Sequence, residues 1–329
     1  MKRALLLFAG LAVSVLLGAS VDGHTIRAGR HGLRPQTFRS YVDVVRVDVL
    51  ASRDRRPLTG LTADDFQVFD NGVPQRVQLV TTAGHVKVLL LLDVSSSLGW
   101  GDKMQALIRA SQSLVEGLEP GDDASLITFS NRVSLRATAL RSREVVEKEL
   151  LIASGHTGGG TALWDALFTG LSFLARDAGR ALMLVFTDGI DTVSWCKDKE
   201  TQEVVRRAEA VVYAVTVPPL PPVGPEDVSA RRGRLDAENR ARASYVPMNL
   251  KEVVEESGGE LFLLRQGEEL TNAFVSILQE FRARYVLTYE PTGVRRDDGW
   301  HELRVRLKGK KGTIRARRGY YATSTKVSR

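Results

Sequence analysis

The chain has 329 residues, of which 43% are hydrophobic and 26% are charged, a composition typical of a globular protein. It excludes a disordered chain, a collagen-like fibre and a small disulfide-stapled fold, and the single cysteine, Cys196, excludes an internal disulfide and a cysteine-based zinc site. The formal charge of +7 is concentrated at the C-terminus, because residues 295–329 hold twelve Lys and Arg against three Asp and Glu.

The first twenty residues have the pattern of a secretory signal peptide. Lys2 and Arg3 precede an uncharged run over residues 4–18 that is apolar except for Ser14, and small residues follow it. The alternative is an N-terminal membrane anchor, but the run is shorter than the ~20 apolar residues that span a bilayer. We therefore predict a signal peptide over residues 1–20, an exported protein (secreted, periplasmic or in the cell envelope) without a transmembrane segment after cleavage, and a flexible leader over residues 21–39.

Residues 40–85 are predicted to form β-strands with one hairpin. The segment 41–50 is rich in valine with partial alternation, which favours a strand. Residues 66–82 give two further strand-like runs on either side of an Asp-Asn-Gly turn at 70–72, whose residues tolerate the positive φ of a tight hairpin. Because so few strands cannot close a core alone, their partners must come from elsewhere in the chain.

From residue 86 the pattern changes to strands that alternate with helices. Val86–Leu92 is apolar except for Lys87, as in a strand covered on both faces. Later strands are expected at 124–129, 133–138, 181–187, 210–217 and 260–264. Helices are expected at 102–118, 142–152, 162–175, 199–209, 250–256 and 268–282. This alternation predicts a doubly wound, mostly parallel sheet over residues 86–283, interrupted by a proline-rich mobile insertion at 218–247.

Residues 284–322 return to β character. Strands are expected at 285–289, 303–307 and 313–321, before a short tail at 323–329. We predict that these strands pair with those of residues 40–85, so that both chain ends build one small β-sandwich. The fold class is therefore α/β, with the doubly wound domain inserted between the two halves of a flanking β-sandwich.

Oxygen-bearing side chains are predicted to gather at one edge of the parallel sheet. In open α/β sheets, ligands bind at the carboxyl ends of the strands, beside a switch in strand order. The candidate ligands are Asp93, Ser95 and Ser97 after the first strand, Thr161 in a Gly-rich loop, Asp188 after the strand at 181–187, and Asp191 shortly beyond it. Such an all-oxygen set suits a hard cation, Mg²⁺, Mn²⁺ or Ca²⁺, and disfavours zinc.

At these positions the chain resembles the von Willebrand factor type A domain with its metal-ion-dependent adhesion site. The motif DxSxS is matched by Asp93, Ser95 and Ser97, the separate threonine by Thr161 in GGGTAL, and the second aspartate by Asp188 in TDGID. The flanks LTADDFQVFDNGVPQ, RYVLTYEP and RARRGYYA look like a bacterial secreted group of such proteins. The resemblance implies a Rossmann-like fold and a divalent cation, Mg²⁺ in the first place. The three hydroxyls would contact it directly or through water, and the two aspartates would mostly hold coordinated waters.

The resemblance also implies a binding protein and not an enzyme, with no catalytic residue and no organic cofactor. An incompletely neutralised cation with an open coordination position attracts an anionic oxygen, and we expect an Asp or Glu side chain of a partner protein. Two alternatives stay open: a metal-dependent hydrolase in which the cation activates water, and a structural envelope component with a vestigial metal site. The Gly-rich loop at 155–161 lacks the lysine of a phosphate-binding loop, which argues against nucleotide binding.

The basic C-terminal region could contact an anionic surface through residues 295–329. Its arginines at 304, 306, 315 and 317 alternate with apolar residues, however, and this pattern predicts the solvated face of a strand pair. A nucleic acid partner is not expected for an exported protein.

Overall fold

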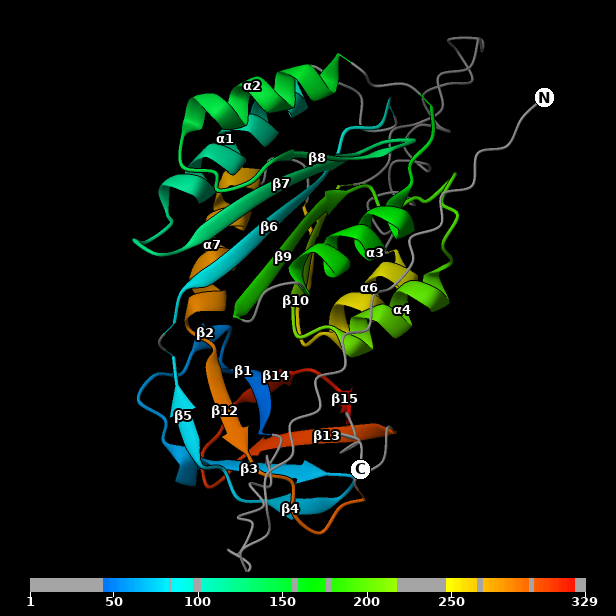
Figure 1. Ribbon diagram of the computed structural model, residues 1–329. Coiled ribbons are helices and arrows are strands. Elements are labelled where there is room, and N and C mark those ends of the chain that lie inside the picture. The colour runs from blue at the N-terminus through cyan, green and yellow to red at the C-terminus, as the bar shows by residue number, and fades with distance from the viewer. Residues whose placement is uncertain are drawn as a thin grey trace, which may run out of the picture. The chain divides into compact units, whose positions relative to one another are not determined.

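The computed structural model describes residues 44–82, 84–96, 102–155, 159–175, 179–217, 247–264, 269–295 and 299–322 (Figure 1). The predicted signal peptide, leader and C-terminal tail lie outside these residues, as do Ser97 and all of the 218–247 insertion except Pro247. No helix within the described ranges is long and apolar enough to cross a membrane.

Six strands form the central sheet of the α/β part. They are β6 (Val86–Asp93), β7 (Asp123–Phe129), β8 (Val133–Ala137), β9 (Arg180–Thr187), β10 (Val211–Thr216) and β11 (Leu261–Leu263). Their order is β11-β10-β9-β6-β7-β8, and all neighbours are parallel except β7 and β8, which form an antiparallel hairpin. The predicted α/β alternation is confirmed, with a mixed sheet whose antiparallel strand lies at one edge.

Helices cover both faces of this sheet, which explains why its central strands β6 and β9 are mostly apolar (Figure 1). One face carries α1 (Asp102–Glu116), α2 (Arg143–Ser154) and α7 (Leu270–Arg282). The other carries α3 (Leu163–Leu174), α4 (Asp198–Arg207) and α6 (Met248–Glu256). Successive residues of β6 point to opposite faces, so Leu90 packs in the first core and Leu91 in the second.

Strands from both chain ends pair in two antiparallel sheets. One has the order β14-β1-β12-β5, with β2 on β1, and the other has the order β15-β13-β3-β4. The strands are β1 (Val45–Arg53), β2 (Arg56–Pro57), β3 (Phe66–Asp70), β4 (Val73–Gln75), β5 (Leu79–Thr81), β12 (Tyr285–Tyr289), β13 (Trp300–Leu307), β14 (Thr313–Ala316) and β15 (Gly319–Tyr321), with a short 3-10 helix at Ala63–Asp65. Val47 lies opposite Leu287 in the first sheet and Val68 opposite Val305 in the second. One apolar cluster contains residues of both sheets.

The predicted hairpin is present, but the strand predicted at 313–321 is wrong in one respect. β3 and β4 turn at Asn71 and Gly72, whose φ angles are 47° and 81°. Residues 313–321 form two strands in different sheets instead of one. The break lies at Arg317, whose guanidinium donates to the carbonyls of Gly319 at 2.6 Å and Arg206 at 2.8 Å.

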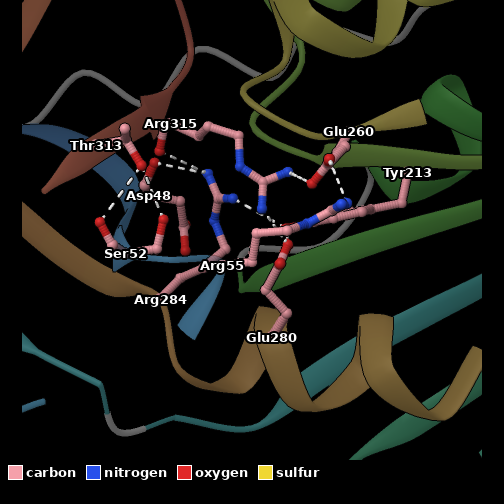
Figure 2. Close-up of polar contacts among 9 residues, drawn as sticks. All are labelled: Asp48, Ser52, Arg55, Tyr213, Glu260, Glu280, Arg284, Thr313 and Arg315. Atoms are coloured by element: carbon pink, nitrogen blue, oxygen red, sulfur yellow. Dashed lines mark hydrogen bonds and ion pairs between the residues drawn. The ribbon is translucent and has the colours of Figure 1, made fainter. Parts of the chain in front are cut away.

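A buried polar network joins the first antiparallel sheet to the α/β part (Figure 2). Arg284, between α7 and β12, is fully buried and donates to the hydroxyl of Tyr213 at 3.1 Å and to the carbonyl of Asp48 at 3.1 Å. Tyr213, on β10, in turn donates to Glu280 of α7 at 2.6 Å. Since these residues come from β1, β10 and α7, the network fixes the end of the last helix to both parts of the structure.

The prediction of a solvated basic face is wrong for two of its four arginines. Arg315 forms ion pairs with Glu260 and Glu280, and Arg317 is held by the two carbonyls named above. The arginines at 304 and 306, on β13, are exposed as predicted. The positive charge of residues 295–329 is therefore partly neutralised within the molecule.

Candidate metal site

The first candidate ligand, Asp93, ends strand β6. β6 and β9 are parallel neighbours with Leu92 opposite Phe186, so their carboxyl ends meet at one edge of the sheet. Asp93 is fully buried, and its two carboxylate oxygens accept the N–H of Ser95 at 2.8 Å and the hydroxyl of Thr187 at 2.7 Å. Burial raises the pKa of Asp93 to about 6, although these hydrogen bonds act in the opposite direction.

Asp188 follows β9, and its charge contributes to the raised pKa of Asp93. The carboxylate of Asp188 is also fully buried: Oδ1 accepts the N–H of Ile190 at 3.0 Å, whereas Oδ2 has no hydrogen-bond partner among the described residues. Lys103, near the start of α1, is a partly buried cation whose charge interacts with that of Asp188. Two interacting buried carboxylates, one with an unpartnered oxygen, are unfavourable without a cation. The residues therefore fit a divalent cation.

Ser95 and Thr161 supply neutral oxygens on two loops that are tied together. Both residues are almost fully buried. The hydroxyl of Ser96 donates to the carbonyl of Gly159 at 3.5 Å, which joins the loop after β6 to the Gly-rich loop. The N–H of Thr161 donates to the hydroxyl of Thr192 at 2.7 Å, and the N–H of Thr192 donates to the carbonyl of Thr161 at 2.9 Å. The position of Thr161 is therefore fixed through its backbone.

Of the five predicted ligands, the structure brings Asp93, Ser95 and Asp188 to one edge of the sheet and ties the loop of Thr161 to theirs. Ser97 lies outside the described residues and stays a prediction. Within the described part of the chain, no three His, Cys, Asp or Glu side chains form a group that could hold a metal. A cation bound here would depend on hydroxyls as well as on the two carboxylates.

Asp191, the further candidate carboxylate, caps a helix in this structure. Its Oδ1 accepts the N–H of Leu163, the first residue of α3, at 2.8 Å, and it also accepts the hydroxyl of Ser194. The Ser194 oxygen in turn accepts the N–H of Trp164 at 3.0 Å. The helix needs this cap because its own N-cap residue, Ala162, makes no side-chain hydrogen bond.

We expect Asp191→Ala to lower the free energy of unfolding by about 1–2 kcal/mol, because α3 loses its cap. We also expect the affinity for Mg²⁺ to stay within a few-fold of wild type, since Asp191 is not a ligand. Urea unfolding and calorimetric titration with Mg²⁺ measure the two effects. Loss of Mg²⁺ binding at unchanged stability would show that Asp191 is a ligand of the cation.

Sequence reasoning missed Thr187 and Thr192, which position ligands. For Thr187 a signal was present, because a hydroxyl at the end of an apolar strand must find a partner when buried. For Thr192 no local signal exists, since its partner, Thr161, is 31 residues away. The same contact explains why residue 160 is a glycine. A Cβ there would lie 2.3 Å from the Thr192 hydroxyl oxygen, so the two loops approach too closely for a side chain.

Residues 88–190 match the von Willebrand factor type A domain family. The match begins in β6 and ends in the loop after β9, so it includes the positions of all five predicted ligands. This segment, about a third of the chain, is similar to a von Willebrand factor type A domain and is here termed the type A domain. The resemblance seen in the sequence is thereby confirmed, whereas the flanking sheets lie outside the match.

Several solved structures are similar to the type A domain and its surroundings. A conserved hypothetical protein, BatB, from Bacteroides thetaiotaomicron is 17% identical, with 60% of this chain and 98% of that chain covered and a TM-score of 0.43. A von Willebrand factor type A protein from Catenulispora acidiphila is 12% identical, with coverage of 82% and 76% and a TM-score of 0.47. A proximal thread matrix protein from the mussel byssus, solved with a zinc-occupied adhesion motif, is 15% identical, with coverage of 64% and 49% and a TM-score of 0.46. The comparison with curated proteins finds no match.

Proposed function

We propose that the type A domain binds a divalent cation, Mg²⁺ in the first place, and uses it to capture an Asp or Glu side chain of a protein partner. The observation that carries this proposal is the buried Oδ2 of Asp188, which has no partner among the described residues and belongs to a carboxylate whose charge acts on the buried Asp93. A bound cation would supply positive charge and an open coordination position for an anionic oxygen.

The residues of this chain have separate tasks in the proposed site. Asp93 and Asp188 supply the negative charge that holds the cation at the edge of the sheet. Ser95 and Thr161, with Ser97 from the sequence, offer oxygens that bind without cancelling its charge. Thr187 orients Asp93 through a 2.7 Å hydrogen bond, and two hydrogen bonds with Thr192, one to its hydroxyl and one from its N–H, hold the Thr161 loop in place.

We further propose that the protein is exported and acts by binding and not by catalysis. The two antiparallel sheets would form a β-sandwich that carries the type A domain, since their side chains share one apolar cluster. Among the described residues, the carboxylates of Asp93 and Asp188 accept hydrogen bonds from backbone N–H groups and a hydroxyl. These bonds suit carboxylates that are held in position better than carboxylates that transfer protons.

Two libraries of displayed peptides test carboxylate capture. The peptides are about nine residues long, which spans about 30 Å when extended, with a fixed central Asp in one library and a fixed central Asn in the other. On the immobilised full chain in Mg²⁺, we expect the Asp library to yield binders that a chelator releases, and the Asn library to yield none. The charge-assisted contact that distinguishes the libraries contributes on the order of 2–5 kcal/mol.

Three variants locate the capture. Asp188→Asn should bind no peptide. Thr161→Ala should bind the recovered peptides about tenfold or more weakly than wild type, while it retains most of its affinity for Mg²⁺. Asp54→Asn, an exposed change of the same type on the β1–β2 turn, should behave as wild type. Equal recovery from both libraries, or recovery in chelator, would contradict the proposed function.

A further inference from the structure

The loop over residues 191–196 presents an exposed tryptophan near the candidate metal site. Trp195 has 92% of its surface exposed, the highest fraction among the large hydrophobic side chains of the described residues, and Val193 is 44% exposed. A fully exposed indole contributes nothing to the core, whereas tryptophan is strongly enriched among the residues that dominate protein–protein interfaces. The exposure of Trp195 therefore indicates a role in recognition.

Hydrogen bonds hold the backbone of Trp195 in this exposed position. The N–H of Trp195 and the N–H of Cys196 donate to the carboxylate of Asp165, in the first turn of α3, at 3.1 Å and 2.8 Å. The preceding residue, Ser194, is bonded to Asp191 and accepts the N–H of Asp165 at 3.2 Å. A partner that covers Trp195 would therefore lose little free energy to ordering of the loop, since its backbone is already fixed.

The same loop is bonded directly to a candidate ligand of the cation. The carbonyl of Thr161 accepts the N–H of Thr192 at 2.9 Å and the N–H of Val193 at 3.3 Å. Trp195 follows Thr192 by three residues, and three residues span at most about 10 Å. The backbone of Trp195 therefore lies within about 10 Å of the residue bonded to Thr161.

We infer that Trp195 is a second anchor for the same partner, which presents an apolar side chain about three residues from the Asp or Glu that the cation captures. The inference rests on the proposed function, because it places the partner's carboxylate at Asp93 and Asp188. The spacing follows from the short reach of this loop: the Trp195 backbone lies within about 10 Å of Thr192, which is bonded to Thr161, and an extended peptide advances about 3.3 Å per residue, so an apolar side chain a few residues from the carboxylate can reach the indole. The cation selects a carboxylate of any context, and Trp195 selects the sequence around it.

The Asp-centred peptide library tests this inference with a readout of its own. On the wild-type chain in Mg²⁺, we expect recovered peptides to be enriched in apolar or aromatic residues about two to four positions from the Asp. On Trp195→Ser the enrichment should vanish, while binding should still require Asp and Mg²⁺. A recovered peptide should bind Trp195→Ser at least about tenfold more weakly, and Trp195→Phe should restore most of the affinity.

A matched control removes a different exposed apolar side chain. Val145 is 40% exposed and lies near the start of α2, at the opposite end of that helix from the Gly-rich loop, so Val145→Ser should bind as wild type. The thermal midpoints of both serine variants should equal that of wild type, which excludes misfolding as a cause. Carboxylate-dependent binding without apolar enrichment, or the same enrichment on Trp195→Ser, would overturn the inference and leave the proposed function standing. No Mg²⁺-dependent binding at all would overturn both.

Discussion

The variant Asp93→Asn, kept free of divalent cations, is expected to be more stable than wild type by about 3 kcal/mol at pH 7. Burial raises the pKa of Asp93 to about 6, about two units above its ordinary value. Each pKa unit corresponds to about 1.4 kcal/mol of unfolding free energy lost by the ionised carboxylate. Asparagine removes the charge and keeps an oxygen for the N–H of Ser95, which now donates at 2.8 Å.

The raised pKa of Asp93 also predicts how the difference in unfolding free energy between Asp93→Asn and wild type depends on pH. Because the folded-state pKa is raised, the stability from this group is full below pH of about 4 and is lost as the pH rises to about 6. Urea unfolding in chelator should therefore show the variant gaining on wild type across this window, while Asp54→Asn shows no such gain. A variant less stable than wild type at pH 7 would mean that the fold favours the ionised carboxylate of Asp93.

The Asp70→Ala variant is expected to lose about 3–5 kcal/mol of unfolding free energy, because it removes the carboxylate that the polar groups of Tyr289, Tyr320 and His301 share. Asp70 ends β3 and is fully buried. It accepts the hydroxyls of Tyr289 at 2.9 Å and Tyr320 at 2.7 Å on one oxygen, and Nδ1 of His301 lies 2.7 Å from the other. These partners come from β12, β15 and β13, so the carboxylate joins the two antiparallel sheets.

A smaller change at the same centre serves as the control for Asp70. Tyr320→Phe removes one of the three partners and leaves the carboxylate bonded to the others, so it should cost about 1 kcal/mol. Chemical unfolding of the full chain measures both variants. A loss below about 1 kcal/mol for Asp70→Ala would show that the two sheets do not depend on this residue.

The sequence was sufficient for the α/β part because its signals are local. Apart from Lys87 and the terminal residues Arg180 and Thr187, the residues of β6 and β9 before the aspartates are apolar. An aspartate ends β6 and another directly follows β9, so the strand ends and their two carboxylates could be placed without any long-range information. The Asn71–Gly72 turn is local for the same reason, since both residues must adopt positive φ.

The parts that could not be predicted depend on contacts between distant residues. Asp70 looked like a turn residue, yet its partners lie 219 to 250 residues away on strands of the other chain end. Arg315 followed an alternation typical of a solvated strand, but Glu260 and Glu280 pair with it from the α/β part. Asp191 has the side chain and the position expected of a metal ligand. It caps α3 only because the start of that helix folds against it, which the local sequence does not indicate.

Calorimetric titration of Mg²⁺ into the chelator-treated full chain tests the central claim most directly. We expect a single site in wild type, its loss in Asp188→Asn and its retention in Asp54→Asn, because Asp188, unlike the exposed Asp54, has a buried oxygen without a partner among the described residues. Unchanged Mg²⁺ binding by Asp188→Asn, or no binding by wild type, would contradict it.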